Sequence, residues 1–228
     1  MVGAGESRLR VVAVSGSLHR PSSTTALVGA LAAAVAERVD AEVRLLELAH
    51  LGPMLGGVLS RDALPAEVEE ALVAIESADL LVAGSPVYRA SFTGLFKHLF
   101  DFVGQHALVD TPVLLAATGG SHRHALTIEH QLRPLFAFFQ ALTLPVGVYA
   151  ASEEFEDGRV RCPEVLDRIE AAAVRALPYL GMVRARPAAR RQRAAASSLG
   201  APSRVVSAVT ASEWASSAST RWVAGSVT

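Results

Sequence analysis

A short polar segment at 15–24 has the residue types of an anion site. It reads Ser-Gly-Ser-Leu-His-Arg-Pro-Ser-Ser-Thr and follows the strand-like run Arg-Val-Val-Ala-Val at 10–14. Hydroxyl groups and unpaired backbone N–H groups would converge where the next helix begins, and the helix dipole favours a negative charge there. The segment predicts a monophosphate site, and serines that only cap the helix are the alternative. The candidate ligands are Ser17, His19, Arg20, Ser22, Ser23 and Thr24.

Two common nucleotide-binding patterns are missing from this segment. A P-loop needs a Gly-Lys pair, but the sole lysine of the chain, Lys97, follows Phe96. The dinucleotide fingerprint needs a third glycine after the strand, whereas Gly3-Ala4-Gly5 lies before it. These departures disfavour an NTPase and a classical dehydrogenase.

Two further loops offer groups that could bind a flat heterocycle. The first follows the apolar run 79–84 with a rigid proline and an aromatic ring, and the second follows the run 112–117 with paired glycines. Paired glycines let a ligand approach the backbone and accept hydrogen bonds from its N–H groups. A core-packed loop and an ordinary turn are the alternatives. The candidate residues are Pro86, Val87, Tyr88, Arg89, Thr118, Gly119 and Gly120.

Alternating apolar strands and amphipathic helices must position these three loops. Such alternation predicts an α/β fold, a doubly wound five-stranded parallel sheet of order 2-1-3-4-5 with helices on both faces. Ligands of such a sheet lie at the carboxyl ends of the strands near the switch point, where the three loops would meet. The predicted strands are 10–14, 41–48, 79–84, 112–117 and 144–148. The predicted helices begin near 22, 65, 93, 125 and 163 and end near 39, 75, 103, 141 and 180.

Together the three loops describe a pocket for a flat ring that carries a phosphate, which is the shape of FMN. A metal site is disfavoured because His122 and His124 are two residues apart, while helical ligands on one face need three or four. Without a G-x-S-x-G elbow, a serine hydrolase is not supported either. No residue is assigned a catalytic role.

Composition sets the outer limits on function. The chain has 228 residues, of which 51% are hydrophobic and 19% charged, with a net charge of −1, as expected for a globular protein with a full core. This near-neutral charge gives no electrostatic reason to expect nucleic acid or an anionic membrane as partner. The single cysteine, Cys162, and the lack of a 20-residue apolar run fit a cytoplasmic protein.

Charge divides the chain into a body and a tail. Residues 184–228 carry seven arginines and one glutamate, a net charge of +6, which leaves −7 for residues 1–183. The tail is rich in Ala and Ser without sustained periodicity, so we expect a disordered appendage to a single domain at 1–183.

The three loops in this order resemble those of the flavodoxin-like NAD(P)H-dependent FMN reductases. The resemblance runs from about residue 9 to 180 and is carried by Val-Ser-Gly-Ser at 14–17, Ser-Pro-Val-Tyr-Arg at 85–89 and Ala-Ala-Thr-Gly-Gly at 116–120. It extends to the reductase components of two-component alkanesulfonate and methanesulfonate monooxygenases. One departure is His19, where many relatives carry an arginine, and Arg20 is the residue that could substitute.

This resemblance implies a set of roles for the chain. The segment 17–24 would hold the FMN phosphate, 86–89 the ring and ribityl chain, and 118–120 the other side of the ring, where backbone N–H groups would stabilise negative charge on the reduced ring. His130 would lie in a π-bulge at a subunit interface of a homodimer or homotetramer. NADH or NADPH would reduce FMN, which would leave for a partner monooxygenase.

Two other functions fit the same sequence. A quinone, azo or chromate reductase would keep FMN tightly bound and pass electrons on at a fixed site. A flavodoxin-type electron carrier would not oxidise a pyridine nucleotide itself, and such carriers are more acidic than this body. How firmly FMN is held distinguishes an FMN reductase that releases its flavin from these two alternatives.

Overall fold

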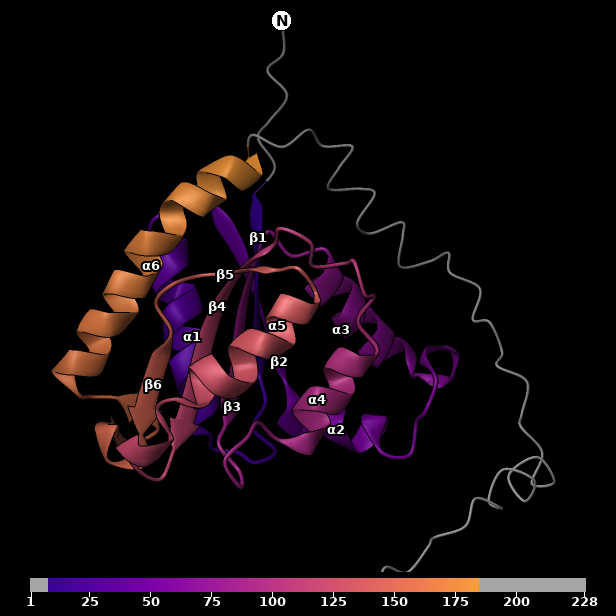
Figure 1. Ribbon diagram of the computed structural model, residues 1–228, viewed down its shortest axis with the longest axis horizontal. Coiled ribbons are helices and arrows are strands. Elements are labelled where there is room, and N and C mark those ends of the chain that lie inside the picture. Colours follow the sequence, from indigo (N-terminus) through magenta and orange to yellow (C-terminus); the bar gives the residue numbers. More distant parts are fainter. Residues whose placement is uncertain (1–7, 185–228) are drawn as a thin grey trace, which may run out of the picture.

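The computed structural model describes residues 8–184, which form one α/β unit (Figure 1). The predicted tail lies outside the described residues except for Arg184, the last residue of the final helix. The order of the sheet is β2-β1-β3-β4-β5, and β6 also pairs with β4. All of these pairings are parallel, so the predicted doubly wound sheet is confirmed.

The main strands are β1 (Leu9–Ser15), β2 (Ala41–Glu47), β3 (Leu80–Pro86), β4 (Pro112–Gly119), β5 (Leu142–Thr143) and β6 (Val148–Ala151). The helices are α1 (Ser23–Ala36), α2 (Leu48–Leu55), α3 (Ala66–Glu76), α4 (Gly94–Asp101), α5 (Arg133–Phe138) and α6 (Pro163–Arg184). A small antiparallel pair, β7 (Phe155–Glu156) and β8 (Arg159–Val160), precedes α6.

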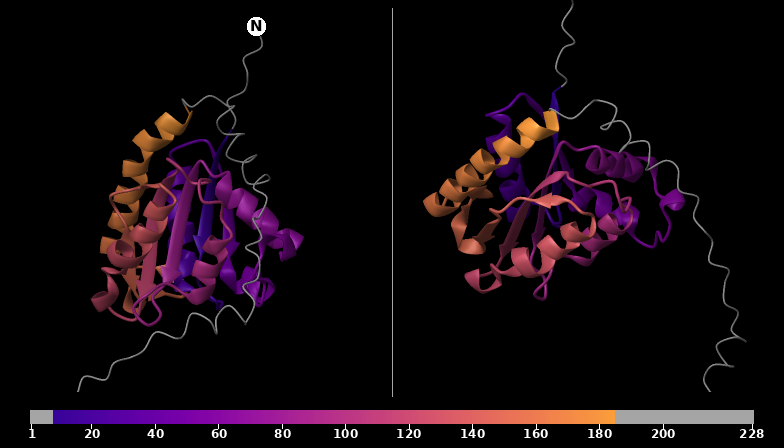
Figure 2. Two further views of the ribbon diagram at one scale, coloured as in Figure 1. Left: turned by 45° about the vertical axis from the view of Figure 1, so that its right-hand side comes forward. Right: turned by 45° about the horizontal axis from the view of Figure 1, so that its top comes forward.

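Helices cover both faces of the sheet, and each face has its own apolar core. One core joins α1 and α6 to β1, β3 and β4, with Leu27, Leu31 and Ile169 fully or almost fully buried. The other joins α2 to α5 to the opposite face, where Phe96, Phe100 and Phe136 stack near one another. Figure 2 shows α6 and α1 on one side of the strands and α3 to α5 on the other. Strands buried on both faces read as continuous apolar runs, which explains why the sequence revealed them.

The register aligns the carboxyl ends of the central strands. Ser15 of β1 pairs with Gly84 of β3, and Gly84 pairs with Ala116 of β4. Loops that follow these strands therefore leave the sheet at one edge, the lower edge in Figure 1. Gly84 permits this packing because an added Cβ would lie 2.3 Å from Val28 Cγ1.

The predicted fifth strand at 144–148 is wrong in its bounds. Two separate segments, β5 and β6, pair with β4 instead of one continuous strand. Val113 and Ala116 of β4 pair with Thr143 and Val148, so the outer strand bulges between these positions. Pro145 cannot donate to a ladder, and Ile128 packs 2.7 Å from where a Cβ of Gly147 would lie.

Two helical predictions also need correction. Helix α2 follows β2 directly and was not expected, because its glycine and proline weaken the helical signal. The predicted helix 125–141 is broken into a π-helical turn at Ile128–Leu132 and α5. His130 lies inside the π-helical turn, so the π-bulge that the resemblance implied is confirmed.

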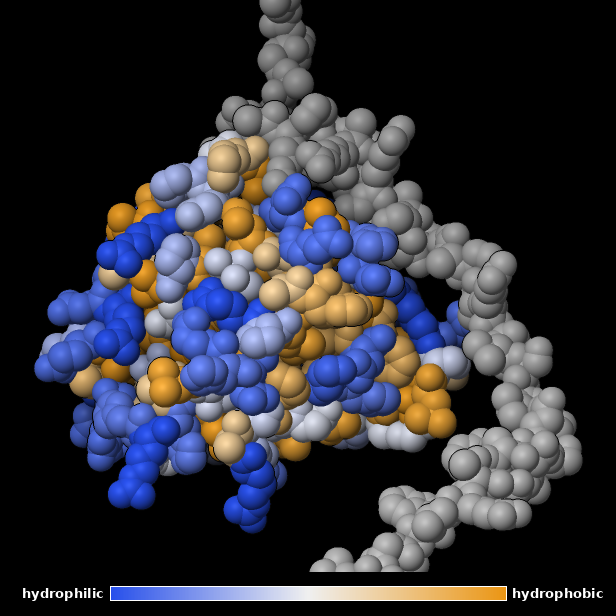
Figure 3. Space-filling model, viewed as in Figure 1, coloured by the Kyte–Doolittle hydropathy of each residue, from blue (hydrophilic) through white to orange (hydrophobic). Residues whose placement is uncertain are grey.

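Apolar side chains are exposed over α5. Phe138 of α5 is 61% exposed, and Leu126 and Leu142 are exposed on either side of the helix in the sequence. Figure 3 shows apolar surface over α5 and toward α4, while charged residues cover much of the rest of this view. No helix within 8–184 is long and apolar enough to cross a membrane.

Candidate functional site

The three predicted loops meet at the carboxyl edge of the sheet. Thr24, in the first turn of α1, and Thr118, near the end of β4, share a hydrogen bond of 2.6 Å between their hydroxyl oxygens, and both residues are buried. In the second loop, the N–H of Val87 donates to the Thr118 carbonyl at 2.7 Å. Thr118 therefore connects all three loops, although Thr24 and Val87 lie 94 and 31 residues before it in the chain.

The start of α1 keeps backbone donors available for an anion. Ser22 caps the helix, and its hydroxyl accepts from the N–H of Thr25 at 3.1 Å. The N–H groups of Ser23 and Thr24 have no hydrogen-bond acceptor within 8–184. Two free donors at the positive end of a helix fit a phosphate.

Ser17 shapes the loop before this helix. Its hydroxyl donates to the His19 carbonyl at 3.2 Å and lies 3.4 Å from the His19 N–H. The side chain is buried, whereas His19 is exposed. Ser17 thus folds the loop back on itself, and the imidazole of His19 is left at the surface.

Arg20 is 59% exposed at its side chain and is already paired with a carboxylate. Its guanidinium pairs with both carboxylate oxygens of Glu47, at the end of β2, with Nε 3.2 Å from Oε1. The Thr25 hydroxyl also donates to Glu47 at 3.4 Å. Glu47 is a site residue that sequence reasoning missed, although its place beside strand 1 follows from the strand order 2-1-3.

The second loop makes a tight turn at the mouth of the site. Tyr88 and Ser91 exchange two backbone hydrogen bonds, and Arg89 and Ala90 between them have φ of 51° and 67°. The turn leaves Tyr88 44% exposed and Arg89 exposed, where either side chain can cover a bound ring. Pro86 and Val87 are half-buried at its base.

Buried hydroxyls fix this second loop to the first. The Thr93 hydroxyl donates to the Gly16 carbonyl at 2.9 Å and caps α4. The Ser85 hydroxyl accepts from the Thr93 N–H at 3.1 Å. These hydroxyls therefore position the loops rather than face a ligand.

The third loop is held by side chains from β6 and the turn after it. The buried Tyr149 hydroxyl donates to the Ser121 carbonyl at 2.5 Å, and the Ser152 hydroxyl donates to the Gly119 carbonyl at 3.2 Å. In a trans peptide the C=O and the following N–H point in opposite directions. The N–H groups of Gly120 and His122 therefore point away from these anchors, and neither has an acceptor among the described residues.

Gly119 is required by this arrangement. A Cβ at this position would lie 2.3 Å from the Tyr149 hydroxyl oxygen. Burial, and the nearby carboxylate of Glu154, raise the pKa of Tyr149 above its usual value of 10.0. The hydroxyl is thus a stable donor throughout the neutral range. Tyr149 and Ser152 were missed in the sequence because they lie about 30 residues beyond the loop that they hold.

The histidines near the third loop do not form a metal centre. His122 lies 3.4 Å from Glu153 and 3.8 Å from Glu154, and these are surface ion pairs if the imidazole is protonated. No cluster of three His, Cys, Asp or Glu within 8–184 is arranged to hold a metal ion. His124 is half-buried and His130 is exposed.

The π-helical turn contacts the site through one hydrogen bond. The Ser91 hydroxyl, in the second loop, donates to Oε1 of Gln131 at 3.1 Å. Gln131 is inside the π-helical turn, so this turn supports the loop that lies at the mouth of the site.

These groups fit FMN. The free N–H groups of α1 suit its phosphate, the exposed turn at 88–90 suits the face of its ring, and the N–H groups of Gly120 and His122 suit its oxygens and ring nitrogens. All lie on three loops at the switch point between β1 and β3, where ligands of this fold bind.

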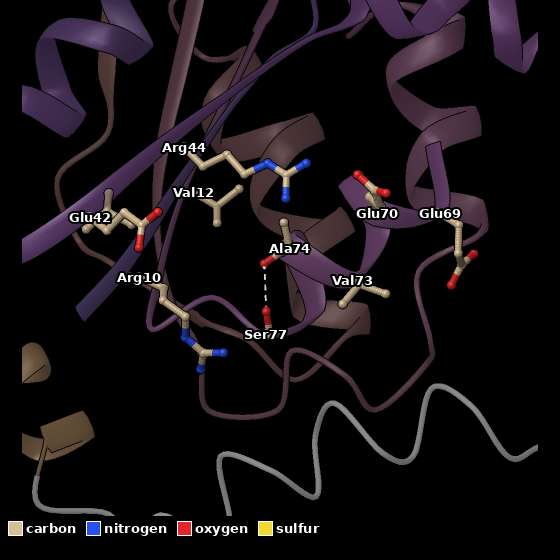
Figure 4. Close-up of a pocket in the computed structure, with 10 residues that line it drawn as sticks. Arg10, Val12, Glu42, Arg44, Glu69, Glu70, Val73, Ala74 and Ser77 are labelled. Atoms are coloured by element: carbon tan, nitrogen blue, oxygen red, sulfur yellow. Dashed lines mark hydrogen bonds between the residues drawn. The ribbon is translucent and has the colours of Figure 1, made fainter. Parts of the chain in front are cut away.

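Two cavities lie away from the junction of the three loops. One of about 460 Å³ lies between β2 and α3 near the amino ends of the strands, lined by Arg44, Glu70 and Val73 among others (Figure 4). A smaller one, of about 280 Å³, lies behind the third loop and is lined by Tyr149, Cys162 and Arg168 among others. The Cys162 thiol donates to Glu164, which raises the pKa of the thiol and disfavours a reactive thiolate.

The sequence model of the family described as NADPH-dependent FMN reductase matches residues 9–156. The chain belongs to this family. It is therefore an NAD(P)H:FMN oxidoreductase, and its cofactors are FMN and a reduced pyridine nucleotide. The match spans all three loops.

Similar proteins agree with this assignment. The chain is 57% identical to the NADH-dependent FMN reductase SfnE of Pseudomonas putida over 76% of this chain and 93% of that protein. It is 52% identical to an FMN reductase (NADPH) of Pseudomonas aeruginosa over 77% and 94%. Among solved structures, an oxidoreductase from Corynebacterium diphtheriae is 36% identical with a TM-score of 0.67, covering 77% of this chain and 99% of that one. Because the first two names differ in the nucleotide, likeness alone does not select NADH or NADPH.

Proposed function

We propose that this FMN reductase passes reduced FMN to a separate flavin-dependent monooxygenase that desulfonates an organic sulfonate. FMN is then a diffusing substrate rather than a fixed prosthetic group. Support for the partner comes from the resemblance of the three loops to reductases of two-component sulfonate monooxygenases. Support for the exchange of FMN comes from the phosphate end of the site.

The observation that carries this proposal is the pairing of Arg20. Within the segment 15–25, Arg20 is the only arginine or lysine, and its guanidinium is bound by Glu47. A phosphate at the start of α1 would be met by neutral backbone N–H groups and hydroxyls, which bind an anion less tightly than a free guanidinium does. Weak retention of the phosphate suits a flavin that must leave.

The site residues divide into three groups under this proposal. The N–H groups of Ser23 and Thr24 bind the phosphate, within a loop shaped by Ser17, His19, Arg20 and Ser22. Pro86, Val87, Tyr88 and Arg89 line the ring and the ribityl chain. Thr118, Gly119 and Gly120 would line the other side of the ring, where the N–H of Gly120, which points away from the carbonyl held by Ser152, would be available as a donor.

Bound FMN supplies the ring N5 that accepts the hydride from C4 of the reduced nicotinamide. The three loops would hold the flavin ring and the nicotinamide against each other, and the exposed turn at Tyr88 to Ala90 would cover them. No side chain needs to transfer a proton for this step. The role of the loops would be to orient the rings, and the N–H of Gly120 would stabilise negative charge on the reduced ring.

Assembly and location are part of the proposal. The exposed apolar surface over α5, which includes Phe138, suits contact with a second copy in a homodimer or homotetramer, together with the adjoining π-helical turn. We place the protein in the cytoplasm, where NADH and NADPH are available.

Steady-state kinetics tests this function. Oxidation of NADH and of NADPH is measured while free FMN is varied from zero to saturation. The proposal expects a rate that rises hyperbolically with FMN and vanishes without it. A purified yellow protein whose rate ignores added FMN would instead identify a fixed flavin, and quinones and azo dyes would then be tested as acceptors.

A further inference from the structure

Glu47 lies at the level of the phosphate loop because of the register of the sheet. It is the last residue of β2 and pairs with Ser15, the last residue of β1. Its side chain is 20% exposed and accepts hydrogen bonds from both the Arg20 guanidinium and the Thr25 hydroxyl. The carboxylate is therefore held beside the first turn of α1, within hydrogen-bonding distance of Arg20 and Thr25.

The pairing uses the face of Arg20 that a phosphate would use. Nε and one terminal nitrogen each contact a different oxygen of the carboxylate, which is the two-pronged geometry that arginine also makes with phosphate. A phosphate must then displace Glu47 or bind without the guanidinium. In either case the negative charge of Glu47 opposes the negative charge of the phosphate.

We propose that Glu47 is a specificity-determining residue that weakens the binding of the flavin phosphate by holding Arg20. It thereby lowers the affinity for FMN without changing the affinity for riboflavin, which lacks the phosphate. This inference rests on the proposed function, because it assumes that the FMN phosphate occupies the start of α1. Beyond that function, the Glu47 carboxylate is given a role in how readily the flavin is released.

The first test compares the dissociation constants of FMN and riboflavin, measured by quenching of flavin fluorescence. We expect Glu47→Gln to bind FMN about fivefold more tightly and riboflavin equally well. The gain should shrink as salt is raised, because the interaction is partly exposed. Glu42→Gln is the matched control: it makes the same charge change on the same strand, about 16 Å away along β2, and should change neither constant.

The second test asks whether Glu47 acts through Arg20. In the wild-type background, Arg20→Ala should weaken FMN binding less than about twofold, because the guanidinium is already paired. In the Glu47→Gln background, the same change should weaken it about fivefold. An equal effect of Arg20→Ala in both backgrounds overturns the proposal, as does an unchanged FMN constant in Glu47→Gln or an equal gain for riboflavin.

These outcomes are separate from failure of the proposed function. If FMN is a tightly held group, wild-type protein retains it before any substitution is made. If FMN binds weakly and exchanges but Glu47→Gln leaves its constant unchanged, the function stands and the role of Glu47 falls.

Discussion

The two ends of the proposed flavin site are built in different ways. At the ring end, the carbonyl groups of Gly119 and Ser121 are each held by a side-chain hydroxyl, from Ser152 and Tyr149. At the phosphate end, backbone donors are left free and Arg20 is drawn to Glu47. The ring end is thus fixed by side-chain hydrogen bonds to two backbone carbonyls, while the phosphate end carries an exposed ion pair.

This difference matches two separate requirements. Hydride transfer needs a ring held in one orientation, and fixed dipoles around it act without reorganisation. Release of reduced FMN needs weak contacts elsewhere on the flavin. Tight and equal binding of oxidised and reduced FMN would only slow the exchange of one for the other. The comparison predicts large effects of substitution at the ring end and smaller ones at the phosphate end.

We expect the largest effect from Gly119→Ala. The added Cβ would lie 2.3 Å from the Tyr149 hydroxyl, which is buried and cannot move without losing Ser121. Overpacking of this kind costs about 2 kcal/mol of stability, and displacement of the loop should weaken FMN binding by at least about tenfold. Thermal unfolding and FMN titration measure the two effects.

Gly120→Ala is the matched control for stability, since no atom within 8–184 lies within 4 Å of its added Cβ. Removal of the hydroxyl in Gly119→Ala/Tyr149→Phe should restore part of the lost stability. If Gly119→Ala unfolds at the wild-type temperature, the close packing of Tyr149 against this loop is wrong.

Tyr149→Phe should have the next largest effect. Loss of the hydrogen bond to Ser121 should cost about 1 kcal/mol of stability. It should also loosen the donors of the third loop, so the midpoint potential of bound FMN should fall by roughly 20 mV, the equivalent of fivefold weaker binding of the reduced form. A spectroelectrochemical titration measures this potential, and an unchanged value would show that Tyr149 does not orient these donors.

The raised pKa of Tyr149 predicts that the stability of the fold depends on pH. Because the folded pKa of Tyr149 is raised, the protonated hydroxyl stabilises the fold fully below pH 10.0, and this contribution is lost as the pH rises through the folded pKa. The difference in unfolding free energy between wild type and Tyr149→Phe should stay constant from neutral pH to about 9 and then decrease. A constant difference up to pH 11 would contradict the raised pKa.

Ser22→Ala at the phosphate end should have a smaller effect on the flavin. Loss of the cap of α1 should cost about 1 kcal/mol of stability but weaken FMN binding only two- to threefold, because the free N–H groups of the helix remain. Ser23→Ala is the control for stability, since its hydroxyl makes no hydrogen bond within 8–184. A tenfold loss of FMN affinity in Ser22→Ala would remove the contrast between the two ends.

The sequence predicted the three loops because their signals are local. Glycine, proline and hydroxyl residues directly follow apolar strands, and the order of a doubly wound sheet brings such strand ends together. The role of Thr118 as the junction of the three loops was not visible, since its contacts with Thr24 and Val87 depend on the register of β3 and β4.

Residues that hold the loops were missed for the same reason. Glu47 has an ordinary place at the end of an alternating strand, and Tyr149 reads as part of an apolar run. Their partners are defined by the packing of distant elements, which no local pattern records. The split of the fifth strand around Pro145 and Gly147 also follows from tertiary packing, here against Ile128.

We infer that the protein holds the flavin ring firmly and the flavin phosphate weakly. The most direct experiment saturates the purified protein with FMN, dialyses it extensively at low concentration, and measures the flavin that remains bound. We expect a colourless protein that regains activity on addition of FMN. A protein that stays yellow, with one FMN per chain, would contradict it.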